Sequence, residues 1–535
     1  MPFGKLLERI NKSQVLFTMM YKYSFRLSFC FACFMCIQLV LCGQPGMQWS
    51  RTYGGSGYDD LRSIEQTADG GYIAVGHTLS SNGNISGQNG SGDFGVFKLN
   101  YAGEIEWQKC LGGNQPDFAN SVQQTSDGGY IVGGSTGSSN GDVLGNRGLV
   151  DYWLVKLDVS GLIQWQKCLG GSSTELAWSC RQTADGGYVI AGYTYSNDGD
   201  VSGNHGDADF WIVKVNSTGE IEWQKALGGS DADYARNIRQ TADGGFIVVG
   251  STESNDGDVS ENQGGLDIWL VKLSASGAMQ WQSSFGGSQT DEAVSIQETS
   301  NGGFIVAGST YSSDGDVLGN RGFVDNWLLK LNALGNLDWQ RCIGGSNNDA
   351  ASSIVQTVDG GYLLAGSSSS ADGDVEVNYG DEDWYVAKLD SIGSIEWKQS
   401  FGGSSFEYPY AVYQSTDEGA IIAGYTASSD VYVTINQGNV DGWIIKLANI
   451  MALDSPSKRE KMQVYPNPAS QSTSVFIDPS LMHKSYRLVN HLGQCIASGT
   501  FVSTELKLSL VGMPAGLYKI VTESFVAGAT FIVVH

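Results

Sequence analysis

Histidine, proline and paired cysteines are scarce in this chain. Only 5 of its 535 residues are histidine and 9 are proline. His77 and His205 lie far apart and have no cysteine beside them, which argues against a transition-metal centre. Four of the nine cysteines lie in the first 43 residues. Most of the others stand where neighbouring repeats have small or apolar residues, so we expect buried free thiols: Cys110, Cys168, Cys180 and Cys342.

Positive charge and long hydrophobic runs are also in short supply. The chain has 31 Lys and Arg against 56 Asp and Glu, a formal net charge of −25. This balance argues against nucleic acids and anionic membranes as partners. The apolar run Leu27–Leu41 follows Lys22 and Arg26, and it is shorter than the roughly 20 residues of a spanning helix. We therefore predict that residues 1–43 are a signal peptide.

Two alternatives to a cleaved signal peptide stay open. The apolar run could anchor the chain in a membrane, or Cys42 could carry a lipid, although Leu41 before it is larger than such sites prefer. A start at Met19 or Met20 would give a signal peptide of more typical length. The signal-peptide prediction leaves no transmembrane segment in the mature chain.

Glycine is abundant, with 72 residues, and much of it belongs to a repeat of 58 residues. The turn D-G-G-Y starts at Asp69, Asp127, Asp185, Asp243, Asn301, Asp359 and Asp417. A tryptophan recurs on the same spacing at Trp49, Trp107, Trp165, Trp223, Trp281, Trp339 and Trp397, and a lysine at Lys98, Lys156, Lys214, Lys272, Lys330, Lys388 and Lys446. Seven registers without an insertion predict a repeat architecture.

Each repeat contains four strand-like stretches bounded by turn residues. In the fourth copy they are 235–241, 246–252, 267–273 and 279–285. The D-G-G turn supplies the positive φ that a tight hairpin requires. Four antiparallel strands per unit are typical of a propeller blade. We therefore predict an all-β fold in which residues 44–449 form a seven-bladed β-propeller, with the repeated tryptophans packed between blades.

The phase of the repeats predicts how the ring closes. Trp49 belongs to the last strand of a blade, yet it comes first in the chain. The final repeat ends at Trp443–Leu447 without such a strand. We therefore expect residues 47–55 to complete the seventh blade and to leave no open sheet edge. An open solenoid is the alternative, and it would not need the missing strand at the other terminus.

Acidic residues recur at the end of the blades opposite the D-G-G turns. One column holds Asp59, Asp117, Glu175, Asp233, Asp291, Asp349 and Glu407, and a second holds Asp93, Asp151, Asp209, Asp267, Asp325, Asp383 and Asp441. Several copies add a pair such as Asp198 with Asp200. These carboxylates are candidate calcium ligands. The alternative is that they cap turns by accepting bonds from loop N–H groups, so we assign no definite metal, cofactor or catalytic residue.

A catalytic site on a symmetric ring needs residues that break the symmetry. Trp178 lies outside the repeated tryptophan positions, and we expect it at the acidic face, as a ligand contact or as a local packing change. The acids are too numerous to single out a pair for glycoside hydrolysis. The sequence therefore favours a non-catalytic role. A carbohydrate-active enzyme with its site on the acidic face and a calcium-stabilised scaffold are the alternatives.

The repeat stops near residue 450. Residues 450–463 include S-P-S-K-R-E-K and are predicted to be a linker. Residues 464–535 contain several short apolar stretches and are predicted to form a small β-sandwich.

Three motifs in this last segment carry a family resemblance. Y-P-N-P at Tyr465–Pro468, L-V-N-H-L-G-Q at Leu488–Gln494 and M-P-A-G-L-Y-K-I at Met513–Ile520 resemble the type A C-terminal sorting domain of type IX secretion cargo in Bacteroidetes-type bacteria. Phe531 departs from the family, which often has lysine there. The resemblance implies passage through an outer-membrane translocon, with release or attachment at the cell surface. The secretion machinery is then the expected partner.

The repeats carry two further resemblances. They are similar to propeller repeats of exported cargo, a family without an assigned activity, and the segment ending at Trp165 resembles quinoprotein-type propeller repeats. The second resemblance implies architecture only, and no quinone cofactor. Together these features predict a secreted or cell-surface, monomeric propeller that binds a glycan or a protein, with no nucleic-acid partner.

Overall fold

The computed structural model describes residues 44–451 and, in the C-terminal segment, residues 462–465, 472–477, 482–483, 485–490, 495–510, 512–522 and 528–533. The predicted signal peptide and most of the predicted linker lie outside these residues. The described part of the chain has no helix, and so none that is long and apolar enough to cross a membrane. The chain divides into two compact units, one of which is Gly43–Met451.

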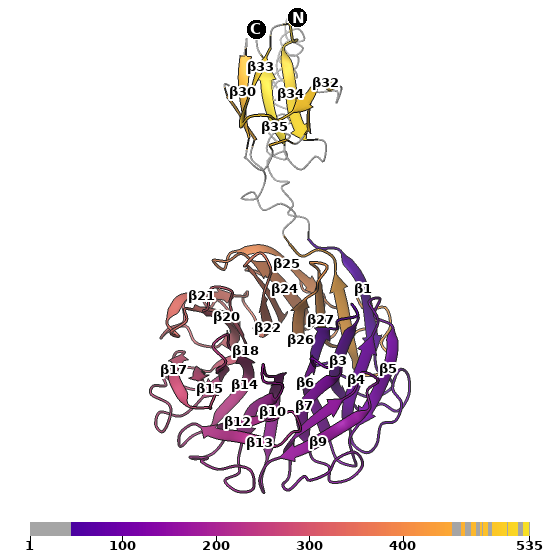
Figure 1. Ribbon diagram of the computed structural model, residues 1–535, viewed down its shortest axis with the longest axis vertical. Helices are drawn as coiled ribbons and strands as arrows, with labels where there is room; N and C mark the ends of the chain where they lie inside the picture. Colours follow the sequence, from indigo (N-terminus) through magenta and orange to yellow (C-terminus); the bar gives the residue numbers. More distant parts are fainter. Residues whose placement is uncertain are drawn as a thin grey trace, which may run out of the picture. The chain divides into compact units, whose positions relative to one another are not determined.

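Seven sheets of four antiparallel strands make up the first unit, which confirms the predicted propeller (Figure 1). Blade 1 holds β2 (Ser63–Gln66), β3 (Tyr72–Thr78), β4 (Asp93–Leu99) and β5 (Ile105–Leu111). Blade 2 holds β6 (Asp117–Gln124), β7 (Tyr130–Thr136), β8 (Asp151–Leu157) and β9 (Ile163–Leu169). Blade 3 holds β10 (Glu175–Gln182), β11 (Tyr188–Thr194), β12 (Asp209–Val215) and β13 (Ile221–Leu227).

The remaining blades follow the same order. Blade 4 holds β14 (Asp233–Gln240), β15 (Phe246–Thr252), β16 (Asp267–Leu273) and β17 (Met279–Phe285). Blade 5 holds β18 (Asp291–Glu298), β19 (Phe304–Thr310), β20 (Asp325–Leu331) and β21 (Leu337–Ile343). Blade 6 holds β22 (Asp349–Gln356), β23 (Tyr362–Ser368), β24 (Asp383–Leu389) and β25 (Ile395–Phe401). Blade 7 holds β26 (Glu407–Gln414), β27 (Ala420–Thr426), β28 (Asp441–Leu447) and β1 (Met47–Tyr53).

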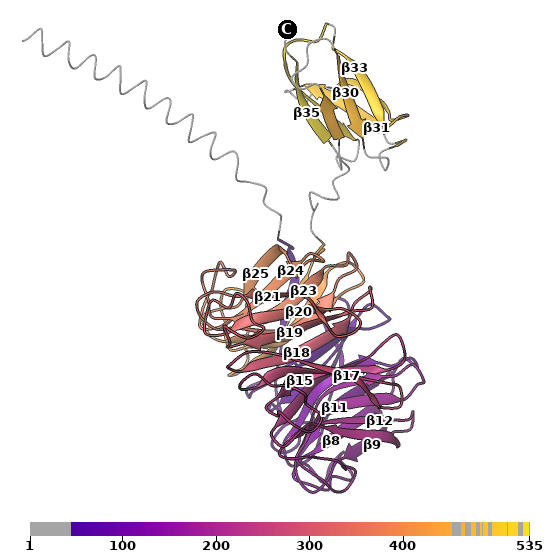
Figure 2. The same ribbon diagram turned by 90° about the vertical axis from the view of Figure 1, so that its left-hand side faces the viewer.

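The first strand of each blade lies nearest the centre of the ring and the last lies at the rim (Figure 1), and Figure 2 shows the same strands from the side. The middle two strands are almost wholly buried, because both of their faces pack against neighbouring blades. Three of the four strands expected in the fourth repeat have the predicted bounds, and β14 begins two residues earlier and ends one residue earlier than expected.

The ring closes through the N-terminal strand, as the phase of the repeats predicted. β1 pairs antiparallel with β28, so the two ends of the propeller share one blade. The hydroxyl of Tyr53 donates to the carbonyl of Gly103 at 2.6 Å, and Trp49 meets Tyr72 of blade 1 edge to face at 6.0 Å. These contacts cross the seam between blades 7 and 1. The open solenoid is therefore ruled out.

A circle of equivalent hydrogen bonds joins every blade to the next near the D-G-G turns. The last residue of each first strand accepts a bond from a turn amide of the preceding blade, as Gln124 does from Ala68 at 2.8 Å. The seventh bond closes the circle, because Gln66 accepts from Thr416 at 2.8 Å. The other five acceptors are Gln182, Gln240, Glu298, Gln356 and Gln414.

The repeated tryptophans of the rim strands pack between blades, as predicted. Trp107 of blade 1 packs edge to face against Tyr130 of blade 2, with the ring centres 5.8 Å apart. A Cβ at Gly161 would lie 2.8 Å from the ring of Trp107, so only glycine lets the turn of blade 2 cover it. The same aromatic contact recurs at six of the seven junctions, which explains why the tryptophan is repeated. At the seventh, the next blade has Ala420, and Trp397 instead donates to the carbonyl of Ile450 at 2.9 Å.

The repeated lysines hold the D-G-G turns. Lys98 is buried, its Nζ lies 2.9 Å from a carboxylate oxygen of Asp69, and it also donates to the carbonyl of Leu99. Blade 5 has Asn301 in place of the aspartate, and there burial lowers the pKa of Lys330. The contrast shows that the turn aspartate stabilises the buried ammonium group.

The C-terminal segment forms two sheets. One contains β29 (Met462–Tyr465), β30 (Ser472–Ile477) and β33 (Glu505–Ser509). The other contains β32 (Cys495–Thr500), β31 (Ser485–Asn490), β34 (Gly516–Thr522) and β35 (Gly528–Val533). Val475 from the first sheet and Leu488 and Ile520 from the second share one buried core, as in a β-sandwich. Parts of the first two sorting motifs lie outside the described residues.

Candidate functional site

The two acidic columns meet in pairs at the junctions between blades. Asp93 of blade 1 and Asp117 of blade 2 both lie against Gly112, where a Cβ would come within 2.6 Å of either carboxylate. Asp117 accepts from the backbone N of Gly113 and from the hydroxyls of Thr136 and Ser138. The same pairing recurs at every junction, including Asp441 with Asp59 at the seam.

One carboxyl group in each pair is poorly stabilised as an anion. Asp93 accepts one bond, from the backbone N of Asn89, and its Oδ1 is buried without a hydrogen-bond partner. Burial, with the charge of Asp117, raises the pKa of Asp93 to about 7. The second column shows the same orphan oxygen in all seven blades: Asp93, Asp151, Asp209, Asp267, Asp325, Asp383 and Asp441.

The candidate calcium loops use their acids to bind the loop itself. Asp198 accepts from the backbone N of Ser172 at 2.7 Å. Asp200 accepts from the N of Gly170 and pairs with Arg147 at 2.5 Å. Within the described residues, no three His, Cys, Asp or Glu side chains gather closely enough to hold a metal ion. These contacts are those of turn capping.

The remaining candidates from the sequence are dispersed. The four cysteines of the propeller are free thiols, and three of them are buried. His77 stacks on Phe118 at 4.4 Å, and burial lowers its pKa to about 4. His205 lies in another blade, where its Nδ1 is 2.8 Å from Asp209.

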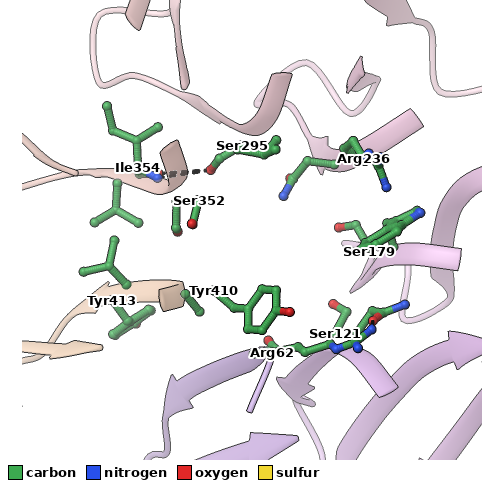
Figure 3. A pocket seen from close by; sticks show the side chains of 18 of the residues that line it. Arg62, Ser121, Ser179, Arg236, Ser295, Ser352, Ile354, Tyr410 and Tyr413 are labelled. Carbon is green, nitrogen blue, oxygen red and sulfur yellow. Dashed lines mark hydrogen bonds between the residues drawn. The ribbon is translucent and has the colours of Figure 1, made fainter. Parts of the chain in front are cut away.

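The central channel holds a cavity of about 710 Å³ at the inner strands of all seven blades (Figure 3). We define the first ring as the residue three positions after the column-one acid: Arg62, Asn120, Trp178, Arg236, Val294, Ser352 and Tyr410. We define the second ring as the residue six positions after it: Glu65, Gln123, Arg181, Arg239, Gln297, Val355 and Tyr413. All fourteen line the cavity.

The two rings break the symmetry of the propeller. The residue that follows the first ring is serine in five blades, and in three of them its hydroxyl accepts a bond from the next inner strand, as Ser295 does from the N of Ile354 at 3.2 Å (Figure 3). The sequence singles out Trp178, and the structure shows that most residues of both rings also differ from blade to blade. Trp178 itself lies in the channel wall rather than on the acidic face, because it follows Glu175 by three residues along β10.

A signal for the rings was present in the sequence. The residues of both rings differ from blade to blade in size and charge, whereas the residues beside them in the sequence change little. Their spacing hid them, because residues three apart point to opposite faces of a regular strand. In β6, β10, β14, β18, β22 and β26 a β-bulge at the first-ring residue shifts the pairing by one, so both rings face the channel.

Arginines are concentrated in this channel. Residues 44–451 contain eight arginines, and four of them line the cavity. Arg62 is tied to its surroundings by an ion pair with Asp60 at 3.0 Å and a hydrogen bond to Asn120 at 2.9 Å. Burial acts to lower the pKa of Arg62, but the carboxylate of Asp60 outweighs it and raises that pKa. Arg62 is therefore already neutralised.

The other three arginines come from blades 3 and 4, and no ion pair within 4.0 Å joins them to a carboxylate of the described residues. Arg236 lies over the ring of Trp178, 4.3 Å from its centre. Arg181 and Arg239 bond only to backbone carbonyls. Burial, with the charge of Arg181, lowers the pKa of Arg239 well below its usual value. This wall of the channel carries excess positive charge.

The fold and this cavity define the class of protein: a seven-bladed β-propeller with a polar, asymmetric central channel. No family model matches the chain. It is 27% identical over 234 residues to the regulatory protein FlaEY of Caulobacter vibrioides, covering 40% of this chain and 24% of that one. The chain therefore spans about a quarter of that relative's length.

Several solved structures are similar to this chain at low sequence identity. PorZ, a surface component of the type IX secretion system of Porphyromonas gingivalis, is 12% identical with a TM-score of 0.39, over 90% of this chain and 60% of PorZ. The WD40 domain of Neurospora crassa Pan2 is 10% identical with a TM-score of 0.42, over 77% of this chain and 98% of that domain. A Bacteroides caccae protein of unknown function is 13% identical with a TM-score of 0.34, over 57% of this chain and 90% of that protein.

Proposed function

We propose that this protein is a secreted or cell-surface binding propeller, without catalysis, whose ligand occupies the central channel. The observation that carries the proposal is the asymmetry of the two channel rings in an otherwise regular ring. A residue that serves the blade is repeated in each blade, as the rim tryptophans and turn lysines are. Trp178, Arg236 and Tyr410 stand at equivalent positions and share no chemistry, so the blade does not require them.

The volume of the channel suits a small ligand. A cavity of about 710 Å³ falls within the range of roughly 300–1,000 Å³ that is usual for small-molecule sites. Aromatic, amide and guanidinium groups converge in it, which favours a ligand that is fixed by hydrogen bonds and stacking. A carbohydrate-active enzyme at this site would need paired carboxylates, and the two carboxylates of the lining, Glu65 and Glu292, come from blades 1 and 5, which are not neighbours.

Binding in the channel is tested by probing a glycan and protein array with the full chain. Trp178→Asn with Tyr410→Asn gives both positions the residue that blade 2 uses at Asn120, and we expect array binding to fall by at least about tenfold. The exposed Val358→Asn, on a D-G-G turn, is the matched control and should bind normally. Unchanged binding by the channel variant would place the ligand elsewhere.

Export through the C-terminal segment forms the second half of the proposal. The resemblance of the three motifs to type IX sorting domains supports it. Deleting Val464–His535 should leave the propeller in the periplasm of the native host, measured by fractionation and immunoblotting. The full chain should reach the surface or the medium. Normal surface export of the truncated chain would overturn the sorting role and leave the channel site untouched.

A further inference from the structure

At Arg181 and Arg239 the second ring lacks a hydrogen bond between blades that other members of the ring make. Where the ring residue is Glu or Gln, it binds the backbone N of the next inner strand: Glu65 accepts from Gln124 at 2.9 Å, and Gln123 accepts from Gln182 at 2.8 Å. Gln297 accepts in the same way from Gln356 at 2.7 Å. Arginine has no acceptor, so Arg181 and Arg239 forgo this bond.

The arginines also place like charges together. Arg181 and Arg239 stand in adjacent blades at the same level of the channel, and the pKa of Arg239 is lowered by burial and by Arg181. Glu65 is the one carboxylate of the second ring, and burial raises its pKa despite these arginines. Arg236, three residues before Arg239 on β14, is a third arginine that lines the same cavity. The cavity lining holds four arginines against the carboxylates of Glu65 and Glu292, so it carries an excess of positive charge that a bound anion would offset.

The opposite wall of the channel has a different character. In a seven-membered ring, blade 7 lies across from blades 3 and 4, and it contributes Tyr410 and Tyr413, which lie on the other side of the cavity from Arg236 (Figure 3). Amides from Asn120 and Gln297 lie on the walls between. A ligand that spans the channel would meet guanidinium groups at one end and phenol rings at the other.

On the proposed function that the channel binds a small molecule, we infer that its ligand is an acidic sugar whose anionic group is held by Arg181, Arg236 and Arg239. Guanidinium groups bind carboxylate and sulfate oxygens in a bidentate manner. Phenol rings and amides suit the C–H faces and hydroxyls of a sugar ring. The net charge of −25 repels large polyanions from the outer surface, so a short acidic saccharide is favoured over nucleic acid.

Calorimetry with trigalacturonate tests this inference, using the full chain. We expect 1:1 binding that weakens as salt increases. Arg181→Gln with Arg239→Gln gives both positions the residue of Gln123 and should lower the affinity by at least about tenfold. The melting temperature should stay equal or rise, because two inter-blade bonds return against the one that Arg181 makes to Val122. Arg321→Gln, at an exposed ion pair with Asp374, is the control and should bind normally.

Three outcomes would overturn the inference. Trigalacturonate could bind the double variant as tightly as the native chain, or inorganic sulfate alone could bind as tightly as the saccharide. A neutral methyl-ester trisaccharide could also bind as well as the acid. If the neutral trisaccharide binds, Tyr410→Asn distinguishes the two explanations. Weaker binding of the trisaccharide by this variant means that the channel is a binding site but the ligand class is wrong, and unchanged binding means that the proposed function is wrong.

Discussion

Deleting residues 45–53 should abolish most of the stability of the propeller. The deletion removes β1, leaves β28 as an open edge and exposes Tyr72, on which Trp49 packs. Losing a single buried aromatic side chain costs about 3–5 kcal/mol, and here Trp49 and Tyr53 leave with a whole strand. We therefore expect a loss of more than about 5 kcal/mol, against a typical total of about 5–15 kcal/mol.

Urea unfolding followed by tryptophan fluorescence measures this loss for the propeller alone. All 14 tryptophans lie between Trp49 and Trp443, so the C-terminal segment contributes no signal. Met47→Ser is the matched control, because Met47 belongs to the same strand and is 39% exposed. It should unfold at nearly the native urea concentration. A deleted chain that unfolds like the native one would contradict closure through β1.

Lowering the pH from 8 to 5 should raise the melting temperature of the propeller. Burial raises the pKa of Asp93 and Asp383 to about 7, against an ordinary value of 3.8. Between about pH 4 and 7 the folded state therefore binds more protons than the unfolded chain, so stability rises as pH falls through this window. Burial also raises the pKa of four further members of column two to about 6, namely Asp151, Asp267, Asp325 and Asp441, and it raises the pKa of Asp233 of column one to about 6.

The aspartates of the D-G-G turns determine the pH below which further acidification destabilises the propeller. Their hydrogen bonds and their lysine partners, against an opposing effect of burial, lower the pKa of Asp69 and Asp127 to about 2. Their contribution is complete above the ordinary value of 3.8 and is lost as pH falls towards 2. The melting temperature should therefore peak near pH 4–5, at least about 5 °C above its value at pH 8.

Thermal unfolding from pH 3 to 8 with a chelator present measures this curve. Asp93→Asn is the matched variant: it should raise the melting temperature at pH 8 and change it little at pH 5, because the native carboxyl is already protonated there. A flat curve would contradict the account of the carboxyl pairs. Added calcium that raises the melting temperature at pH 8 and removes the gain from acidification would instead assign the carboxylates to metal binding.

The architecture could be predicted because the same structural signals recur in every repeat of the sequence. Each strand, turn and tryptophan appears up to seven times on one spacing, so local ambiguity in any copy is resolved by the others. Closure followed from phase alone, since Trp49 precedes the first full repeat and the last repeat lacks its equivalent. The only boundary error in the fourth repeat concerned β14, whose bulge at Arg236 breaks the alternation that marks a strand.

The residues that line the channel could not be predicted from the sequence in the same way. Arg181 and Arg239 are 58 residues apart and Tyr410 is far from both, and they share a cavity only after seven inner strands meet around one axis. The bulge also changes which residues face inward, so a period of two misplaces the second ring. The repeated positions predict the propeller scaffold, but the residues that line the channel stand at positions that vary between repeats.

A crystal structure of the full chain with trigalacturonate tests the central claim most directly. We expect the saccharide in the central channel, with a carboxylate within hydrogen-bonding distance of Arg181, Arg236 or Arg239 and a sugar ring towards Tyr410 or Tyr413. A saccharide bound only on the outer loops, with the channel left to solvent, would contradict the claim that the asymmetric rings form the binding site.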